Sequence, residues 1–318
     1  LAEPFVVAAQ DTFGNATAGR QIWFKVTRGG GKLGGLDSAV VATNAQGRAS
    51  TTLTLGTVPD TNRVAATSTG LVGSPVTFSA TATARAPMKL AFTVQPTNAV
   101  AGVAITSAIL VAVQDTFGNT ATTSTANITL AITSGTGTTG ALLGGTLTQA
   151  AVSGVATFAN LTVDKVGTGY TLTATATSLT SATSTAFSVT AGAATKLAVT
   201  VQPSAVVAGA VITPAVQVTV QDAQGNTVTG STASVTLAIT SGTGTSGAVL
   251  GGTATVAAVS GVATFANLTV DKVGTGYTLT ATASSLTSAI SSAFSACTPQ
   301  LGCGLALDQF SQIPAGTF

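Results

Sequence analysis

The sequence contains no histidine, only two cysteines and a single tryptophan among its 318 residues. Without histidine it can form neither a Ser-His-Asp triad nor a Cys-His pair, and two thiols do not favour a zinc site made of protein ligands. Its nine acidic residues never cluster within one loop, so a calcium site is left open only at a junction between domains. These absences predict a protein that is not an enzyme and that holds no metal or cofactor.

Charge is scarce as well. Charged residues make up 6% of the chain, against about 25% in a typical soluble domain. There is no basic run for nucleic acid, and no apolar run approaches the roughly 20 residues of a membrane-spanning helix. A surface with so little charge associates readily unless something covers it. We therefore expect neither nucleic acid nor a membrane span, and the partners expected are copies of the chain itself and glycans on Ser, Thr or Asn.

The two cysteines lie close together, Cys297 and Cys303, in the segment ACTPQLGCG. A pair at this spacing, in a chain without other thiols, indicates a local disulfide formed in an oxidising compartment. The predicted location is extracellular or at the cell surface.

An internal repeat organises the chain. The segment Lys89–Gly102 (KLAFTVQPTNAVAG) recurs as Lys196–Gly209 (KLAVTVQPSAVVAG), an offset of 107 residues, and a long segment beginning at Ser153 recurs almost unchanged at the same offset. A more diverged copy precedes these two, with QDTFGN at Gln10–Asn15. A fixed period of this kind predicts domains in tandem. The predicted boundaries are an incomplete domain at 1–86, complete domains at 87–192 and 193–296, and a cysteine-linked tail with a further strand at 297–318.

Within each copy the pattern favours β-strands. Leu90, Phe92 and Val94 alternate with small or polar residues, which predicts a strand with one buried face. Thr and Val, which favour sheets, are abundant, and no stretch has helical periodicity. About 100 residues with seven or so strands is the size of an immunoglobulin-like sandwich. The predicted fold is all-β: three tandem immunoglobulin-like β-sandwich domains, the first lacking its N-terminal strand.

Each copy also carries a D-x-x-G-N turn between two apolar strands. The aspartate can accept hydrogen bonds from amides within the turn, while Gly and Asn tolerate positive φ. Recurrence at equivalent positions favours a structural role for these side chains over a catalytic one. The turn residues are Asp11 and Asn15, Asp115 and Asn119, and Asp222 and Asn226.

A second recurring feature is G-x-G-Y, which places Tyr170 and Tyr277 where a sandwich has its tyrosine corner. Asn62 aligns with this position in the first copy, so the corner is expected to be lost there. The D-x-x-G-N turn, the later G-x-A-x-F strand and the A-G-x-x-x-V/L-x-A strand together resemble the bacterial Ig-like (Big) domains of invasin- and intimin-type surface proteins. The resemblance covers essentially the whole chain. It implies an extracellular location and a role as spacer, stalk, adhesive tip or filament subunit.

The second and third copies open with a K-L-A-x-T-V strand that the first copy lacks. The tail GLALDQFSQIPAG, from Gly304 to Gly316, matches that strand, with Leu305 and Leu307 at the positions of Leu90 and Phe92. One interpretation is that the tail of one subunit completes the first domain of the next, which is donor-strand complementation and propagates as a filament. The predicted donor residues are Leu305, Leu307, Phe310 and Ile313, and the predicted acceptor residues are Phe5, Val7, Ile22, Phe24 and Val26.

The alternative is that the sequence is a window of a longer tandem array, the spacer or stalk of a long bacterial surface adhesin. Six of the eleven basic residues lie between Arg20 and Arg63, whereas the tail carries Asp308 and no basic residue. This charge difference, and the cysteines placed just before the tail strand, favour the filament.

The single tryptophan, Trp23, lies in the strand that contains Ile22, Phe24 and Val26. Alternation puts Trp23 and Lys25 on the opposite face from those three apolar residues. We expect Trp23 to point outward against another subunit or a surface ligand, with simple burial as the alternative.

Overall fold

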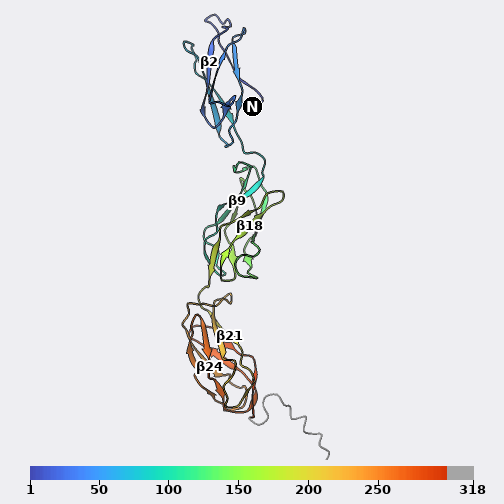
Figure 1. The fold of residues 1–318 in the computed structure, drawn as a ribbon, viewed down its shortest axis with the longest axis vertical. Helices are drawn as coiled ribbons and strands as arrows, with labels where there is room; N and C mark the ends of the chain where they lie inside the picture. The colour runs from blue at the N-terminus through green and yellow to red at the C-terminus, as the bar shows by residue number, and fades with distance from the viewer. Residues whose placement is uncertain (299–318) are drawn as a thin grey trace, which may run out of the picture.

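The computed structural model describes residues 1–298, and every regular element among them is a β-strand. The strands form three groups that follow one another along an elongated molecule (Figure 1), and no sheet contains strands from two groups. The described residues contain no helix long and apolar enough to cross a membrane. The predicted all-β architecture of three β-sandwich domains is confirmed.

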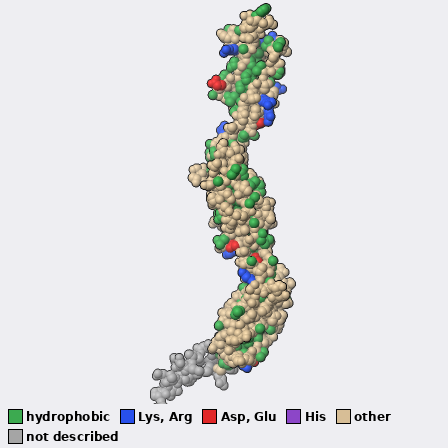
Figure 2. Space-filling view, turned by 180° about the vertical axis from the view of Figure 1, so that it is seen from behind, with side chains coloured by type: hydrophobic (Ala, Val, Ile, Leu, Met, Phe, Trp, Pro, Cys, Tyr) green, Lys and Arg blue, Asp and Glu red, His purple; other side chains and the backbone are tan. Residues whose placement is uncertain are grey.

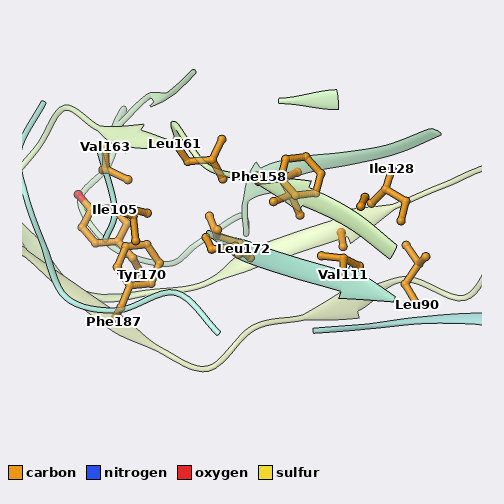
Figure 3. Close-up of a cluster of buried hydrophobic side chains, with 14 of the residues drawn as sticks. Leu90, Ile105, Val111, Ile128, Phe158, Leu161, Val163, Tyr170, Leu172 and Phe187 are labelled. Carbon is orange, nitrogen blue, oxygen red and sulfur yellow. The ribbon is translucent and has the colours of Figure 1, made fainter. Parts of the chain in front are cut away.

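The second domain shows the complete fold. One sheet has the order β15–β11–β9 and faces a second sheet with the order β14–β12–β18–β19, and two smaller sheets have the orders β10–β20–β17 and β13–β16. Apolar side chains from both sheets meet between them, and Leu90, Val111 and Ile128 lie at one end of this core (Figure 3). The strands are β9 (Lys89–Val94), β10 (Ala99–Val100), β11 (Ile109–Gln114), β12 (Asn127–Ile132), β13 (Leu143–Gly144), β14 (Thr148–Ala150), β15 (Val155–Phe158), β16 (Thr162–Val163), β17 (Gly167–Tyr170), β18 (Leu172–Thr175), β19 (Ala182–Thr183) and β20 (Phe187–Thr190).

The third domain repeats this topology strand for strand, as the near-identical sequence predicts. Its strands are β21 (Lys196–Val201), β22 (Val206–Val207), β23 (Val216–Gln221), β24 (Ser234–Ile239), β25 (Leu250–Gly251), β26 (Thr255–Ala257), β27 (Val262–Phe265), β28 (Thr269–Val270), β29 (Gly274–Tyr277), β30 (Leu279–Thr282), β31 (Ala289–Ile290) and β32 (Phe294–Cys297).

The first domain has a smaller core. Seven apolar residues form its fully buried cluster, against 19 and 18 in the corresponding clusters of the second and third domains, counted over the described chain. Its sheets are β4–β2–β7–β8, β1–β5 and β3–β6. Its strands are β1 (Phe5–Ala8), β2 (Gln21–Arg28), β3 (Lys32–Leu33), β4 (Ser38–Ala42), β5 (Arg48–Thr51), β6 (Leu53–Thr54), β7 (Thr61–Thr67) and β8 (Val76–Thr81).

The tyrosine corners form in the two complete domains. The Tyr170 hydroxyl donates to the carbonyl of Lys165 at 2.8 Å, and Tyr277 makes the same bond to Lys272 at 2.8 Å. In the first domain Asn62 is buried at this position, and its Oδ1 accepts the Gly31 N–H at 2.8 Å. The corner is therefore replaced by a smaller side chain with its own hydrogen bond to a neighbouring loop.

Candidate functional site: an open sheet edge and the domain junctions

In the described part of the chain, the first domain has an open sheet edge. In each of the other two domains, a strand of the same domain covers the equivalent edge. In the second domain β11 lies between β15 and β9, so that Val111 has Ala156 on one side and Phe92 on the other. The equivalent strand β1 pairs with β5 alone in the described part of the chain, and Val7 faces only Ala49. The outer backbone groups of β1 thus have no strand beside them in this part of the chain, which makes the edge a template for another strand.

In the second domain, β9 lies along the edge that corresponds to the open edge of β1. The Leu90 N–H donates to the carbonyl of Thr180 at 2.8 Å, and the Thr180 N–H donates to the carbonyl of Met88 at 2.9 Å. Strand β9 therefore bridges β11 and the loop before β19. The Leu90 side chain is 4% exposed and points into the core beside Val111 (Figure 3).

A groove lies at the corresponding place in the first domain. Its lining includes Val7 and Ala8 of β1, Ile22 and Ala66, and the segment from Leu71 to Val76, which leads into β8. Because this segment is the counterpart of the one that holds Thr180, the groove lies at the position that β9 occupies in the second domain. Its lining is mostly apolar.

The structure brings the predicted acceptor residues into one cluster. Ile22 and Phe24 are buried, while Phe5, Val7 and Val26 are half-buried and pack against them. Phe5 also stacks on Phe78 of β8, with 4.7 Å between the ring centroids. The predicted donor residues Leu305, Leu307, Phe310 and Ile313 lie outside the described residues. Cys303 does too, so the disulfide with Cys297, at the end of β32, stays a prediction.

The D-x-x-G-N turns form a second kind of site, at the junctions between domains. The Asp115 carboxylate accepts the N–H groups of Phe117 and Asn119, both at 2.9 Å, inside its own turn. It also accepts the N–H of Arg85 at 3.0 Å, from the linker that leaves the first domain. One side chain thereby fixes the turn and the linker together.

The next junction is built in the same way. Asp222 accepts the N–H of Asn226 at 2.9 Å within its turn and that of Gly192 at 3.0 Å from the linker. Arg85 and Gly192 each lie four residues before the first strand of the following domain. In the first domain Asp11 has hydrogen bonds to Phe13 and Asn15 of its own turn, and within residues 1–298 it receives none from a linker.

At both junctions the asparagine of the turn reaches the preceding domain. The Asn119 amide donates to the carbonyl of Thr57 at 2.6 Å, and that of Asn226 donates to the carbonyl of Asp164 at 2.8 Å. Asn226 additionally accepts the N–H of Val166 at 3.1 Å. Pro59 stands at the equivalent position in the first domain and has no N–H to give. The second junction therefore carries one more hydrogen bond of this kind than the first.

These contacts perturb the aspartates. Burial of Asp115 opposes its ionisation and is the largest single influence, but the hydrogen bonds from Asn119 and from the Arg85 and Phe117 amides outweigh it, and its pKa falls to about 2. The pKa of Asp222 is lowered by the same balance of burial against hydrogen bonds. The pKa of Asp11 is lowered mainly by the Asn15 side chain. All three carboxylates are held in the charged form.

Trp23 and Lys25 lie on the outer face of β2, with Trp23 55% exposed. Opposite Trp23 on β4 is Val40, which is 60% exposed. At the same register position the second domain has a hydrogen-bonded pair, Thr129 and Thr148, at 2.8 Å. The first domain is thus distinguished by an exposed apolar pair, and a subunit or ligand covering it stays a prediction.

Charge is unevenly distributed over the molecule. On the face that Figure 2 shows, Lys and Arg side chains gather on the first domain and near the junctions, and most of the surface of the other two domains is uncharged. In residues 1–298 there is no group of three or more acidic or cysteine side chains placed to hold a metal ion.

Comparisons with known proteins find similarity in structure. No protein-family model matches the chain, and no curated protein matches its sequence. Among solved structures, the Escherichia coli adhesin FdeC matches with 18% identity over 90% of both chains at a TM-score of 0.44, and InvD of Yersinia pseudotuberculosis matches with 17% identity over 91% of both at 0.38. Invasin, a bacterial integrin-binding protein, matches with 18% identity and a TM-score of 0.31, over 90% of this chain and 55% of invasin.

Proposed function

We propose that the chain is a structural subunit of an extracellular filament that polymerises head to tail by donor-strand complementation. The C-terminal strand of one copy fills the open edge of the first domain in the next copy. The observation that carries this proposal is the groove beside β1, at the position that β9 occupies in the second domain. Because the donor and the acceptor are different segments of the chain, each added copy leaves a new acceptor free, and growth is open-ended.

The repeat gives the register of the added strand. In the second domain Leu90 faces Val113 and Phe92 faces Val111, antiparallel. By the same spacing Leu305 faces Ala9 and Leu307 faces Val7. Two apolar side chains then enter the groove from the donor.

The energy of this contact favours a long-lived joint. Burying a leucine side chain fully contributes roughly 1.5–3 kcal/mol, and each hydrogen bond of the strand ladder adds about 0.5–1.5 kcal/mol. The groove and the edge are also a liability when empty, since unpaired strand edges and exposed apolar patches promote non-specific association.

The direct test removes the donor. Chains lacking residues 304–318, and chains carrying Leu305→Asp with Leu307→Asp, should not form filaments in electron micrographs. The matched control is Asp308→Glu, at the position of the exposed Thr93, which keeps the negative charge of the tail and should assemble as the unmodified chain does. Long assemblies formed by the deletion variant contradict the proposal.

A second candidate function is a spacer in the stalk of a long surface adhesin. The hydrogen-bonded junctions favour it, because each linker is fixed to the following domain by an aspartate rather than left free. N-terminal sequencing of the protein isolated from its cells separates the two functions. A native chain that continues upstream of Leu1 with its own K-L-A-x-T-V strand supports the stalk and overturns the donor-strand filament.

A further inference from the structure

Every domain of this chain has two half-junctions, one at each end. At one end is the D-x-x-G-N turn, and at the other is the loop after the short strand that contains Val163 in the second domain. The turn of one domain meets this loop of the preceding domain at both junctions, through Asn119 on Thr57 and through Asn226 on Asp164. Each half-junction is therefore a surface that binds the half-junction of the opposite kind on a neighbouring domain.

Two half-junctions meet no other domain within the described residues, and they lie at the two ends of the molecule (Figure 1). The turn of the first domain is QDTFGN, identical to the turn of the second domain, and its Phe13 is 88% exposed. The loop of the third domain is VDKVG, identical to the loop that receives Asn226. Both free halves have the sequence of halves that are joined elsewhere in the same chain.

The free loop is already in the conformation that binds. In the second domain the Asp164 carboxylate accepts the Leu142 N–H at 2.7 Å, and in the third domain Asp271 accepts the Val249 N–H at 2.7 Å. The Val273 side chain beside it is 45% exposed. Val273 stands at the position of Val166 and so has a backbone N–H there, whereas Pro59 at the same position in the first domain has none.

A glycine near each loop supports the match. A Cβ added to Gly102 would lie 2.4 Å from Nε2 of Gln224, so the following turn covers this glycine closely. Its counterpart Gly209 has open space around it. Phe13 occupies the position of Gln224 in the first-domain turn. The open surface at Gly209 is thus the place for the exposed Phe13 ring.

We propose that these two halves bind each other between successive copies of the chain. Asn15 donates its amide to the carbonyl of Asp271 and accepts the N–H of Val273, as Asn226 does with Asp164 and Val166. This inference rests on the proposed filament and adds to it a second contact that is separate from the donor strand. The joint between copies then repeats the junction between the second and third domains, and the filament stays stiff across the subunit boundary.

The test uses one variant on each side of the joint. Val273→Pro removes the N–H, as Pro59 does naturally, and Asn15→Ala removes the side chain that meets it. Both variants keep the donor strand and the groove, so filaments should still form. They should bend more in electron micrographs and lose terminal subunits about fivefold faster for each hydrogen bond removed. The double variant should lose subunits no faster than the Asn15→Ala variant, because Asn15→Ala already removes the hydrogen bond that Val273→Pro breaks.

The control is Val166→Pro, which removes the same N–H inside the chain and should leave subunit loss unchanged. Unaltered Trp23 fluorescence and tyrosine absorbance in each variant check that the domains are folded. If both variants form filaments with unmodified stiffness and dissociation rate, this inference is wrong while the donor-strand proposal stands. If chains with intact donor strands form no filament, the donor-strand proposal fails, and the joint falls with it.

Discussion

The first domain should be stabilised when the missing strand is supplied within the same chain. Moving residues 304–318 to a position before Leu1 places two residues between Gly316 and Leu1, as two residues separate Gly102 from Ile105. The transferred strand can then lie along β1 as β9 lies along β11. No copy of this rearranged chain retains a free donor strand, so it should also stay monomeric.

The expected gain follows from the second domain. There Leu90 is 4% exposed and Phe92 is half-buried, so Leu305 and Leu307 together contribute about 3–4 kcal/mol of apolar burial. The entropy of ordering the strand offsets part of this, and a net gain of roughly 1–3 kcal/mol remains. At about 4–8 °C per kcal/mol for a domain of this size, the first domain should melt roughly 5–20 °C higher.

The chain offers a convenient assay. Its only tryptophan, Trp23, lies in the first domain, and its two tyrosines lie one each in the second and third. Trp23 fluorescence therefore follows the first domain alone during heating. The matched control is the same rearranged chain with Leu305→Asp and Leu307→Asp, which should melt as the unmodified first domain does. If the melting temperature followed by Trp23 fluorescence does not rise, or rises equally in the control, the transferred strand does not complete the first domain.

Three further predictions concern the domains and their junctions. Tyr170→Phe removes the corner hydrogen bond and should lower the free energy of unfolding of the second domain by about 0.5–1.5 kcal/mol in calorimetry, and an unchanged transition contradicts the assigned bond. The folded-state pKa of Asp115, about 2, lies below its ordinary value of 3.8, so its contribution to the junction is complete above pH 4 and is lost as the pH falls through 2. The protection of the Arg85 amide from hydrogen exchange, relative to the intrinsic exchange rate at each pH, should fall over that range. Asp115→Asn should remove this fall in protection. Protection that stays constant in the unmodified chain would show that the carboxylate does not hold the linker. Gly137→Ala should destabilise the second domain by about 2–4 kcal/mol, since the added Cβ would lie 2.1 Å from the Tyr170 ring, whereas Gly135→Ala, with similarly positive φ but open space, should cost less in the same chemical denaturation experiment.

The sequence predicts the strands well because the repeat and the alternation are local. The period of two in Leu90, Phe92 and Val94 identifies a half-buried strand, and the alternation around Trp23 gives its outward direction. That β1 pairs with β5 alone in residues 1–298 agrees with a comparison of the copies, since the 318 residues hold no K-L-A-x-T-V segment before the first turn. Each of these predictions needs only neighbouring residues and a second copy to compare.

The junction contacts could not be predicted in the same way. The turn chemistry indicates that Asp115 binds amides ahead of it, but the bond to Arg85 joins residues 30 positions apart, and that from Asn119 to Thr57 joins residues 62 apart. Such bonds depend on the angle at which one domain follows the next. The available signal was the fixed spacing of Arg85 and Gly192, each four residues before a new domain.

Whether a strand from another copy lies along β1 can be seen in an electron cryo-microscopy map of the assembled protein. We expect a strand antiparallel to β1 with Leu307 opposite Val7, connected through density to the third domain of the neighbouring subunit. An edge of β1 that is empty in the assembled filament, or filled by a strand continuous with Leu1 of the same chain, would contradict this expectation.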